Sequence, residues 1–506
     1  MTSLFMLLLV GQAQASLPCG TMEKFDEFIA TSPVPAPPRP PSDAKGVRDA
    51  MSGVCNGTEI SDNFILKWGL DAPPADDEIA LIMDALETSW RHQLEVMGHA
   101  SPYGTEDYLF NVYVGDSGGC APSARGVGGY YTTDDEGWPI IVLSQGVFSN
   151  VDYGQTTVAH EFYHAVQHAE GAYSSRGTVQ WWWEATAMWV EGEVYPGTED
   201  YYSFLYGYAF EPHLQLNAYT SLTSAGLLEE YHQYGAAIWP RYLTEYVTSW
   251  ATIRDTWAYG GSDDDPLDYI AEVLAAELGE DVDDVFADFA AHNATWDYLH
   301  GENILTFLDF MSESTSFGDR DRRITEIIGS AGTGAMWNSP PTETLPQRYG
   351  YNTLRMFSPS EGDLTLRFKG EAEGSDGSPS VWTARAVVDS GSRVSYTDVP
   401  LSEGEGEVTL SMSGTEDDVY LVVAVSSPRW NEGETFNYQY QFDAPAYGSG
   451  SVGGGGGESS GAASSGPTAY QPKEKGGGCS HGPPRSMGLA VLILALLVRS
   501  RQDGCG

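Results

Sequence analysis

Three histidines stand four residues apart in the stretch TTVAHEFYHAVQHAEG, residues 156–171. On an α-helix, residues i and i+4 lie on one face about 6 Å apart, so His160 and His164 can bind one metal ion. Glu161 follows the first histidine and can reach a water at that ion, as a general base must. His168 lies eight residues after His160, about 12 Å along a helix axis, which is too far for bonds of about 2.1 Å to one ion. We therefore expect His168 to lie outside the ligand set.

A third ligand must come from elsewhere in the chain. Glu184 lies twenty positions after His164, inside the segment WWWEATAMWVE, whose tryptophans predict a buried helix. A buried carboxylate needs a compensating charge, which a zinc ion would supply. The alternative is that Glu184 and Glu191 pair with arginines, but Arg176 is the only basic residue for some distance. We predict a Zn²⁺ site formed by the two histidines, Glu184 and a water.

The surrounding sequence predicts the elements that must position these residues. Strands are indicated by NFILKWG from Asn63, by YLFNVYVG and by WPIIVLSQ, and a helix by the apolar spacing over residues 77–97. We expect WPIIVLSQ to act as an edge strand that holds a substrate backbone. Strands followed by the histidine helix and a mainly helical half, to about residue 315, predict an α+β fold. We assign residues 61–344 to this catalytic domain.

From about residue 345 the apolar period changes from 3.6 to 2. The alternating apolar positions are Leu364, Leu366 and Phe368, then Val408, Leu410 and Met412, then Phe436, Tyr438, Tyr440 and Phe442. Short alternating strands separated by Gly, Ser and Asp turns predict an all-β sandwich over residues 345–445.

Both ends of the chain resemble targeting segments. Residues 1–15 read as a secretory signal peptide, and residues 16–60 as an N-terminal segment with a Pro-rich spacer. Residues 446–478 form a Gly/Ser-rich linker, and residues 479–506 resemble a sorting tail of the MYXO-CTERM type. The apolar run 487–498 is too short to span a bilayer, which takes about 20 residues. We expect a protein exported to the cell surface or released from it, with the membrane met only through the unprocessed tail.

Three cysteines lie in the body of the chain, namely Cys19, Cys55 and Cys120. They allow at most one intramolecular disulfide, which suits an exported protein. For Cys19 the simpler expectation is a disulfide to Cys55 or Cys120. The alternative is that the N-terminal segment folds back, so that the Cys19 thiolate caps the zinc and holds a precursor inactive.

The composition limits the possible partners. With 25 basic and 71 acidic residues, the net charge of −46 opposes binding to nucleic acid and to anionic membrane surfaces. Only 19% of the residues are charged and 12% are aromatic, which indicates a folded, acid-coated protein. We expect a monomer that acts on a peptide or protein.

The pattern HExxH followed by W-x-x-E-x-x-A-x-W-x-E resembles the gluzincin clan of zinc metallopeptidases, and its aminopeptidase branch in particular. The whole chain is similar to secreted metalloproteases of the MXAN type from myxobacteria. The resemblance implies a zincin-like domain, with His160, His164 and Glu184 as zinc ligands. Members of the clan often carry an acidic residue four after the ligand glutamate to orient the first histidine. Met188 stands at that position here, so a different residue must orient the histidine.

The resemblance also implies an oxyanion donor, which is a tyrosine in a Y-x-x-G-A motif in the aminopeptidase branch. Here HQYGA places His232 three before Gly235, and either His232 or Tyr234 could donate. The alternative is that these aromatics are core packing in a helix kinked at Pro240.

Taken together, the residues predict a secreted or surface-displayed zinc-dependent peptidase with Glu161 as its general base. Two other classes stay open. One is a cell-surface binding or adhesion protein on a zincin-like frame, with a structural metal or none. The other is a non-peptidase hydrolase with the same chemistry.

Overall fold

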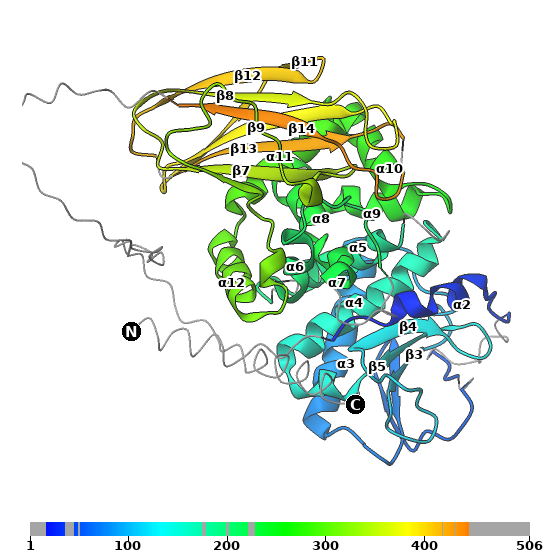
Figure 1. Ribbon diagram of the computed structural model, residues 1–506. Helices are drawn as coiled ribbons and strands as arrows, with labels where there is room; N and C mark the ends of the chain where they lie inside the picture. The colour runs from blue at the N-terminus through cyan, green and yellow to red at the C-terminus, as the bar shows by residue number, and fades with distance from the viewer. Residues whose placement is uncertain are drawn as a thin grey trace, which may run out of the picture. The chain divides into compact units, whose positions relative to one another are not determined.

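The structure of the chain is a computed structural model (Figure 1). It describes residues 17–35, 45–48, 51–174, 179–198, 202–220, 228–416, 418–429 and 431–444. The expected signal peptide, Gly/Ser-rich linker and sorting tail lie outside these residues.

A five-stranded mixed sheet precedes the histidine helix, with its strands in the order β1-β2-β3-β5-β4. Strands β2, β3 and β5 run parallel, whereas β1 and β4 are antiparallel to their neighbours. Every residue of β3, β4 and β5 is buried, as expected for strands covered on both faces. The strands are β1 (Gly57–Ile60), β2 (Phe64–Trp68), β3 (Phe110–Val114), β4 (Gly129–Thr133) and β5 (Pro139–Leu143).

The edge of this sheet differs from the one expected. The segment WPIIVLSQ forms β5, but β5 lies between β3 and β4 and pairs on both sides. The expectation that it is the edge strand is therefore wrong. The edge strands are β1 and β4, and β4, with the sequence GYYTT, lacks the aliphatic run that marks β5.

The predicted histidine helix is α4 (Val151–Glu170). The Asn150 side chain caps its first turn by accepting a hydrogen bond from the Tyr153 amide at 3.2 Å. Gly171 ends it in the left-handed conformation, with φ of 76°. The helix expected over residues 77–97 is α3 (Asp76–Trp90), followed by a π-helical turn over Arg91–Val96. Figure 1 shows α4 beside β4 on one side and α5 on the other.

The described residues between 180 and 314 are mainly helical, as predicted. Helix α5 (Gln180–Val194) packs against α4. The later helices are α6 (Tyr202–Ala209), α7 (Leu228–Gly235), α8 (Ile238–Tyr242), α9 (Trp250–Tyr259), α10 (Pro266–Val273), α11 (Val282–Thr295) and α12 (Gly301–Ser314).

Two further sheets follow the helices. The first has the strand order β10-β9-β13-β7-β6, and the second β11-β12-β8-β14. Their strands are β6 (Glu326–Ile328), β7 (Gly350–Phe357), β8 (Gly362–Gly370), β9 (Val381–Asp389), β10 (Val394–Asp398), β11 (Leu401–Ser402), β12 (Glu405–Met412), β13 (Asp418–Ser426) and β14 (Tyr438–Asp443).

Both sheets contribute to one apolar cluster, which includes Leu364, Leu366 and Phe368 of β8, each fully buried. The alternation read from the sequence therefore does point these side chains inward. Other residues of β13, among them Tyr420 and Val422, join the core of the helical part. Helix α11 contacts β9 and β13. Helices and strands are mostly segregated along the chain, so the fold is of the α+β type.

The cysteines pair differently from the simpler expectation. Cys55 and Cys120 form a disulfide, and Cys19 is a buried free thiol. The expected Cys19 disulfide is therefore wrong. Cys19 lies instead at the start of a short turn and helix, η1 (Thr21–Lys24) and α2 (Phe25–Ala30). Among the described residues, no helix has both the length and the apolar character needed to cross a membrane.

Candidate metal centre

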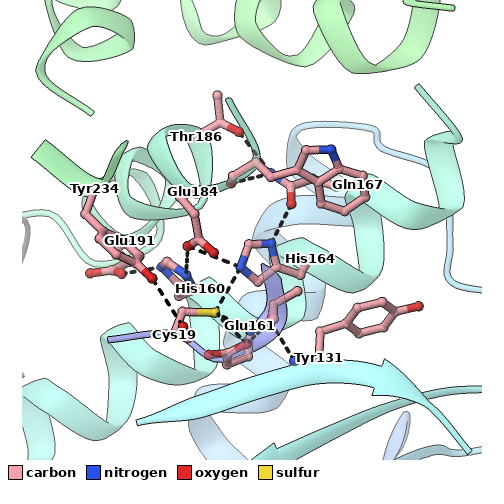
Figure 2. Close-up of polar contacts among 12 residues, drawn as sticks. Cys19, Tyr131, His160, Glu161, His164, Gln167, Glu184, Thr186, Glu191 and Tyr234 are labelled. Atoms are coloured by element: carbon pink, nitrogen blue, oxygen red, sulfur yellow. Dashed lines mark hydrogen bonds and ion pairs between the residues drawn. The ribbon is translucent and has the colours of Figure 1, made fainter. Parts of the chain in front are cut away.

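Helix α4 places two histidines on its buried face. The rings of His160 and His164 are one turn apart, with centroids separated by 4.8 Å. Both rings are almost fully buried. Figure 2 shows them pointing toward a carboxylate from α5.

That carboxylate belongs to Glu184, whose side chain is fully buried. Its Oε2 atom lies 3.2 Å from Nε2 of His160 and 3.7 Å from Nε2 of His164. Among the described residues, no lysine or arginine forms an ion pair with it. The structure thus brings together the three residues predicted as metal ligands.

Cys19 adds a fourth donor atom to the cluster. Its Sγ lies 3.3 Å from Nε2 of His164. One ligand atom from each of Cys19, His160, His164 and Glu184 falls within 4.8 Å of all the others. The thiol was expected in a disulfide, and only the alternative interpretation placed it here.

Three separations within the cluster fit a tetrahedral metal ion. Two bonds of about 2.1 Å at the tetrahedral angle hold their donor atoms about 3.4 Å apart. The three separations of 3.2, 3.3 and 3.7 Å are close to that value. In addition, the buried Oε1 of Glu184 has no hydrogen-bond partner among the described residues. Imidazole, carboxylate and thiolate donors are those that divalent transition metals prefer, so the cluster could hold such an ion.

Gln167 fixes the orientation of one histidine. Its Oε1 lies 2.7 Å from Nδ1 of His164. Its amide nitrogen donates to the Trp183 carbonyl and to Oγ1 of Thr186, each at 2.9 Å. The Gln167 oxygen must therefore accept from a protonated Nδ1 of His164. This leaves the Nε2 lone pair facing the cluster, as a metal ligand requires.

Glu191 does the same for the other histidine. Its Oε1 lies 2.9 Å from Nδ1 of His160, and both groups are buried. The sequence left this orienting residue open, because Met188 occupies the position where an acidic residue was expected. The packing of α5 against α4 brings Glu191 to His160.

Glu161 lies beside the four donor atoms, between α4 and β4. Its Oε2 accepts a hydrogen bond from Oγ1 of Thr21 at 3.0 Å and from Sγ of Cys19 at 3.5 Å. Gly129 of β4 faces it so closely that a Cβ there would lie 2.9 Å from Cγ of Glu161. Glycine at this position therefore makes room for the carboxylate.

The electrostatics of the cluster favour a cation. Burial alone would raise the pKa of Glu184, but hydrogen bonding to His160 and the charge of His164 lower it to about 2. Burial lowers the pKa of His160, but hydrogen bonds with Cys19, Glu184 and Glu191 raise it well above its usual range. Burial also raises the pKa values of Glu161 and Cys19. The buried acidic groups thus share the two imidazoles as their nearest positive partners, and a divalent cation would add the positive charge that they lack.

The structure separates the two candidate oxyanion donors. The hydroxyl of Tyr234 donates to the Cys19 carbonyl oxygen at 3.2 Å, so Tyr234 reaches the cluster. His232 does not, since its ring packs on Tyr208, and burial lowers its pKa to about 3 with His213 nearby. His232 is therefore core packing, as one interpretation of this helix held.

His168 lies outside the four-residue cluster, as expected from its distance along the helix. Its Nδ1 lies 2.5 Å from the hydroxyl of Tyr131, and its ring packs on Phe28. Burial lowers the pKa of His168 to about 4, so the ring is neutral. It supports the turn and helix that carry Cys19.

We compared the chain with known proteins. No curated protein matches it. One solved structure found is that of a GH115 4-O-methyl-α-glucuronidase with specificity for decorated arabinogalactans, at 10% identity and a TM-score of 0.15. The match covers 59% of this chain and only 39% of the glucuronidase. A family model described as "family of unknown function (DUF6055)" matches residues 51–446, a range that includes both histidines, Glu161 and Glu184. The chain therefore belongs to the DUF6055 family.

Proposed function

We propose that this protein is an exported zinc-dependent peptidase of the gluzincin type, which hydrolyses peptide bonds in peptides or proteins. One observation carries the proposal. Donor atoms of His160, His164 and Glu184 meet within 4.8 Å of one another, with the carboxylate of Glu161 beside them. Two imidazoles and one carboxylate form a known ligand set of catalytic zinc.

Zinc in this site would supply a Lewis acid that polarises a carbonyl group and acidifies water. The other tasks fall to residues of the chain. Glu161 takes the proton of the attacking water, because its carboxylate lies next to the ligand atoms. Gln167 and Glu191 keep both imidazoles in the orientation that presents Nε2.

Tyr234 is the proposed oxyanion donor. Its hydroxyl already donates to a backbone carbonyl oxygen, that of Cys19, at the edge of the cluster. Burial raises the pKa of Tyr234 well above its usual range, so the hydroxyl keeps its proton and stays a donor. A substrate carbonyl in the same place would receive this hydrogen bond as negative charge develops on its oxygen.

An extended substrate would lie along the edge of the first sheet. The amide of Gly128 and the carbonyl of Gly129 already bond backbone groups of another segment there. Main-chain pairing at a sheet edge binds peptides with little regard to their side chains. This arrangement supports a peptide over a small-molecule substrate.

Three further assignments belong to the proposal. The first sheet with α4 and α5 would form a zincin-like catalytic domain, and the two later sheets a β-sandwich around their shared apolar cluster. The protein would work as a monomer outside the cell or on its surface. The Cys55–Cys120 disulfide supports export, because such bonds persist mainly in oxidising compartments.

A second candidate is a surface binding protein with a structural metal. One observation favours it, namely that Cys19 supplies a fourth donor atom, whereas catalytic zinc keeps one position for water. The two candidates differ in whether the metal site can turn over a substrate once Cys19 is removed.

Metal content tests the ligand assignment. We expect one zinc per purified full-length chain, and none in His164→Ala. His168→Ala is the matched control, because it changes a histidine one turn further along α4 and outside the cluster, and it should keep the zinc. If wild type contains no zinc, even after zinc is added to chelated protein, the proposed function is wrong.

A further inference from the structure

The turn and helix that carry Cys19 form a distinct unit, here called the N-terminal segment and defined as residues 17–30. The Sγ atom of Cys19 lies 3.3 Å from Nε2 of His164, on the side of the cluster that faces Glu161 (Figure 2). A zinc ion held by the two histidines and Glu184 would have its fourth position at this sulfur. That position is where the water of a catalytic site must bind.

The same segment also forms hydrogen bonds with the general base, Glu161. Oε2 of Glu161 accepts hydrogen bonds from the Thr21 hydroxyl at 3.0 Å and from the Cys19 thiol at 3.5 Å. Two neighbouring residues of one segment therefore cover both the metal side and the base side of the site. A cysteine that served only to complete a structural site would not need the contact of Thr21 with Glu161.

The segment runs along β4, the edge strand that the proposed function assigns to substrate. The Gly128 amide donates to the Pro18 carbonyl at 3.1 Å, and the Gly20 amide donates to the Gly129 carbonyl at 2.9 Å. One step further, the Tyr131 amide donates to Oγ1 of Thr21 at 2.8 Å. Residue numbers increase in the same direction along the segment and along β4, so the two run parallel. While it is there, these backbone groups are not available to another peptide.

The Tyr234 hydroxyl is engaged as well, since it donates to the Cys19 carbonyl at 3.2 Å. The segment thus contacts every component of the proposed mechanism: ligands, base, oxyanion donor and substrate edge. However, the atom it presents to the ligands is a sulfur and not a scissile carbonyl. It fills the site without offering a bond to cut.

Apolar contacts hold the segment in place. Met22, Phe25 and Phe28 are almost fully buried. Phe25 and Phe28 pack on Trp183, and Phe28 also packs on Tyr131. Burial of these aromatic side chains stabilises the docked segment. The segment is therefore stably docked, with Met22, Phe25 and Phe28 in the main apolar cluster.

The segment lies outside the part of the chain that defines the family. The family model begins at residue 51 and so contains three ligands and the general base but not Cys19. Between the two lies the Pro-rich stretch SPVPAPPRPP, residues 32–41, which the sequence predicts to be an extended spacer. The three ligands and the general base thus lie within the family range, and the segment that covers them lies outside it.

We propose that the N-terminal segment is an autoinhibitory segment, in which Cys19 is the fourth metal ligand and keeps the site closed until the segment is displaced. This inference rests on the proposed function. On displacement the sulfur leaves the metal, a water can take its place, and Thr21 releases Glu161. No oxidation or reduction is involved, and the protein is made in a latent form.

The test uses the full-length chain with cobalt(II) in place of zinc. Thiolate ligation gives cobalt a ligand-to-metal charge-transfer absorption in the near ultraviolet. We expect this band in wild type and its loss in Cys19→Ser, while one metal per chain remains. Casein hydrolysis by the zinc form should be at least tenfold faster in Cys19→Ser than in wild type. Thr21→Val is the matched comparison, because it removes the hydroxyl that bonds Glu161 but should keep the charge-transfer band.

Alkylation of wild type covers the case in which Cys19→Ser does not fold. Iodoacetamide modification of Cys19, located by mass spectrometry, should be at least tenfold slower with zinc bound than after chelation. Equal rates in the two forms would overturn the proposal, because a ligating thiolate is shielded by its metal.

The remaining outcomes separate this inference from the proposed function. If wild type binds metal without the charge-transfer band, or if Cys19→Ser is no more active than wild type, the segment is not inhibitory. The proposed peptidase function is not affected by either result. If Cys19→Ser folds but loses the metal, the four-ligand site is structural. If no form binds metal, both proposals are wrong.

Discussion

Glu191 offers a graded test of how the metal site is built. Its Oε1 lies 2.9 Å from Nδ1 of His160, and both groups are buried. A carboxylate in this position fixes the imidazole and makes Nε2 a stronger donor, and its loss typically costs ten- to a hundredfold in metal affinity. That range corresponds to about 1.4 to 2.7 kcal/mol.

Two substitutions should fall at different places in this range. Glu191→Gln keeps an oxygen that can accept from Nδ1 but removes the charge, so zinc affinity should fall about tenfold. Glu191→Ala removes the acceptor as well and should come nearer to a hundredfold. The matched control is Glu193→Gln, two residues further along α5, where the carboxylate lies near Arg241 and not near a ligand. It should bind zinc as wild type does.

The assay is competition for zinc with a chelator of known affinity at fixed pH, followed for all four proteins. Thermal unfolding of the metal-free forms shows whether a variant is folded. Equal zinc affinities for wild type, Glu191→Gln and Glu191→Ala would refute the orienting role of Glu191. A larger loss in Glu193→Gln than in Glu191→Gln would refute it as well.

Three further predictions concern stability. Burial lowers the pKa of His168 from 6.5 to about 4, so the unfolded chain takes up this proton at a higher pH than the folded one. The free energy of unfolding that the neutral, buried His168 contributes is complete above pH 6.5 and is lost as the pH falls toward 4. At pH 5 the loss is about 2 kcal/mol. His168→Gln should flatten this part of the pH profile of stability, as measured by urea unfolding. Replacing Cys55 and Cys120 by serine should lower the free energy of unfolding by about 4 kcal/mol in the same assay, because their bridge joins residues 65 apart in sequence. Phe28→Ala should weaken docking of the N-terminal segment by about 3 kcal/mol, because its ring is fully buried, and hydrogen exchange of the segment's amides should become faster while that of α4 does not change.

The parts of the site that follow a local rule could be predicted from the sequence. Helical spacing identifies His160 and His164 as a pair, and the charge cost of a buried carboxylate identifies Glu184. The period-2 pattern of β8 gave its buried face correctly. In each case the position of the side chain is determined by spacing within one helix or strand, or by burial alone.

The parts that depend on how elements pack could not be predicted. Glu191 reaches His160 through the packing of α5 against α4, which the residue spacing within α5 does not specify. The choice between His232 and Tyr234 depends on which side of α7 faces the cluster. The edge position of β4 depends on the order of strands in the sheet. Cys19 joins its partners across more than 140 residues, a separation over which sequence gives no register.

The most direct test of the account is the turnover of casein by Cys19→Ser and by Cys19→Ser/Glu161→Gln, with zinc measured in both. We expect one zinc per chain in each protein and a rate at least a hundredfold lower in the double variant, because a carboxamide cannot take the proton from water. Equal rates, or no casein hydrolysis by a zinc-loaded Cys19→Ser protein, would contradict the account.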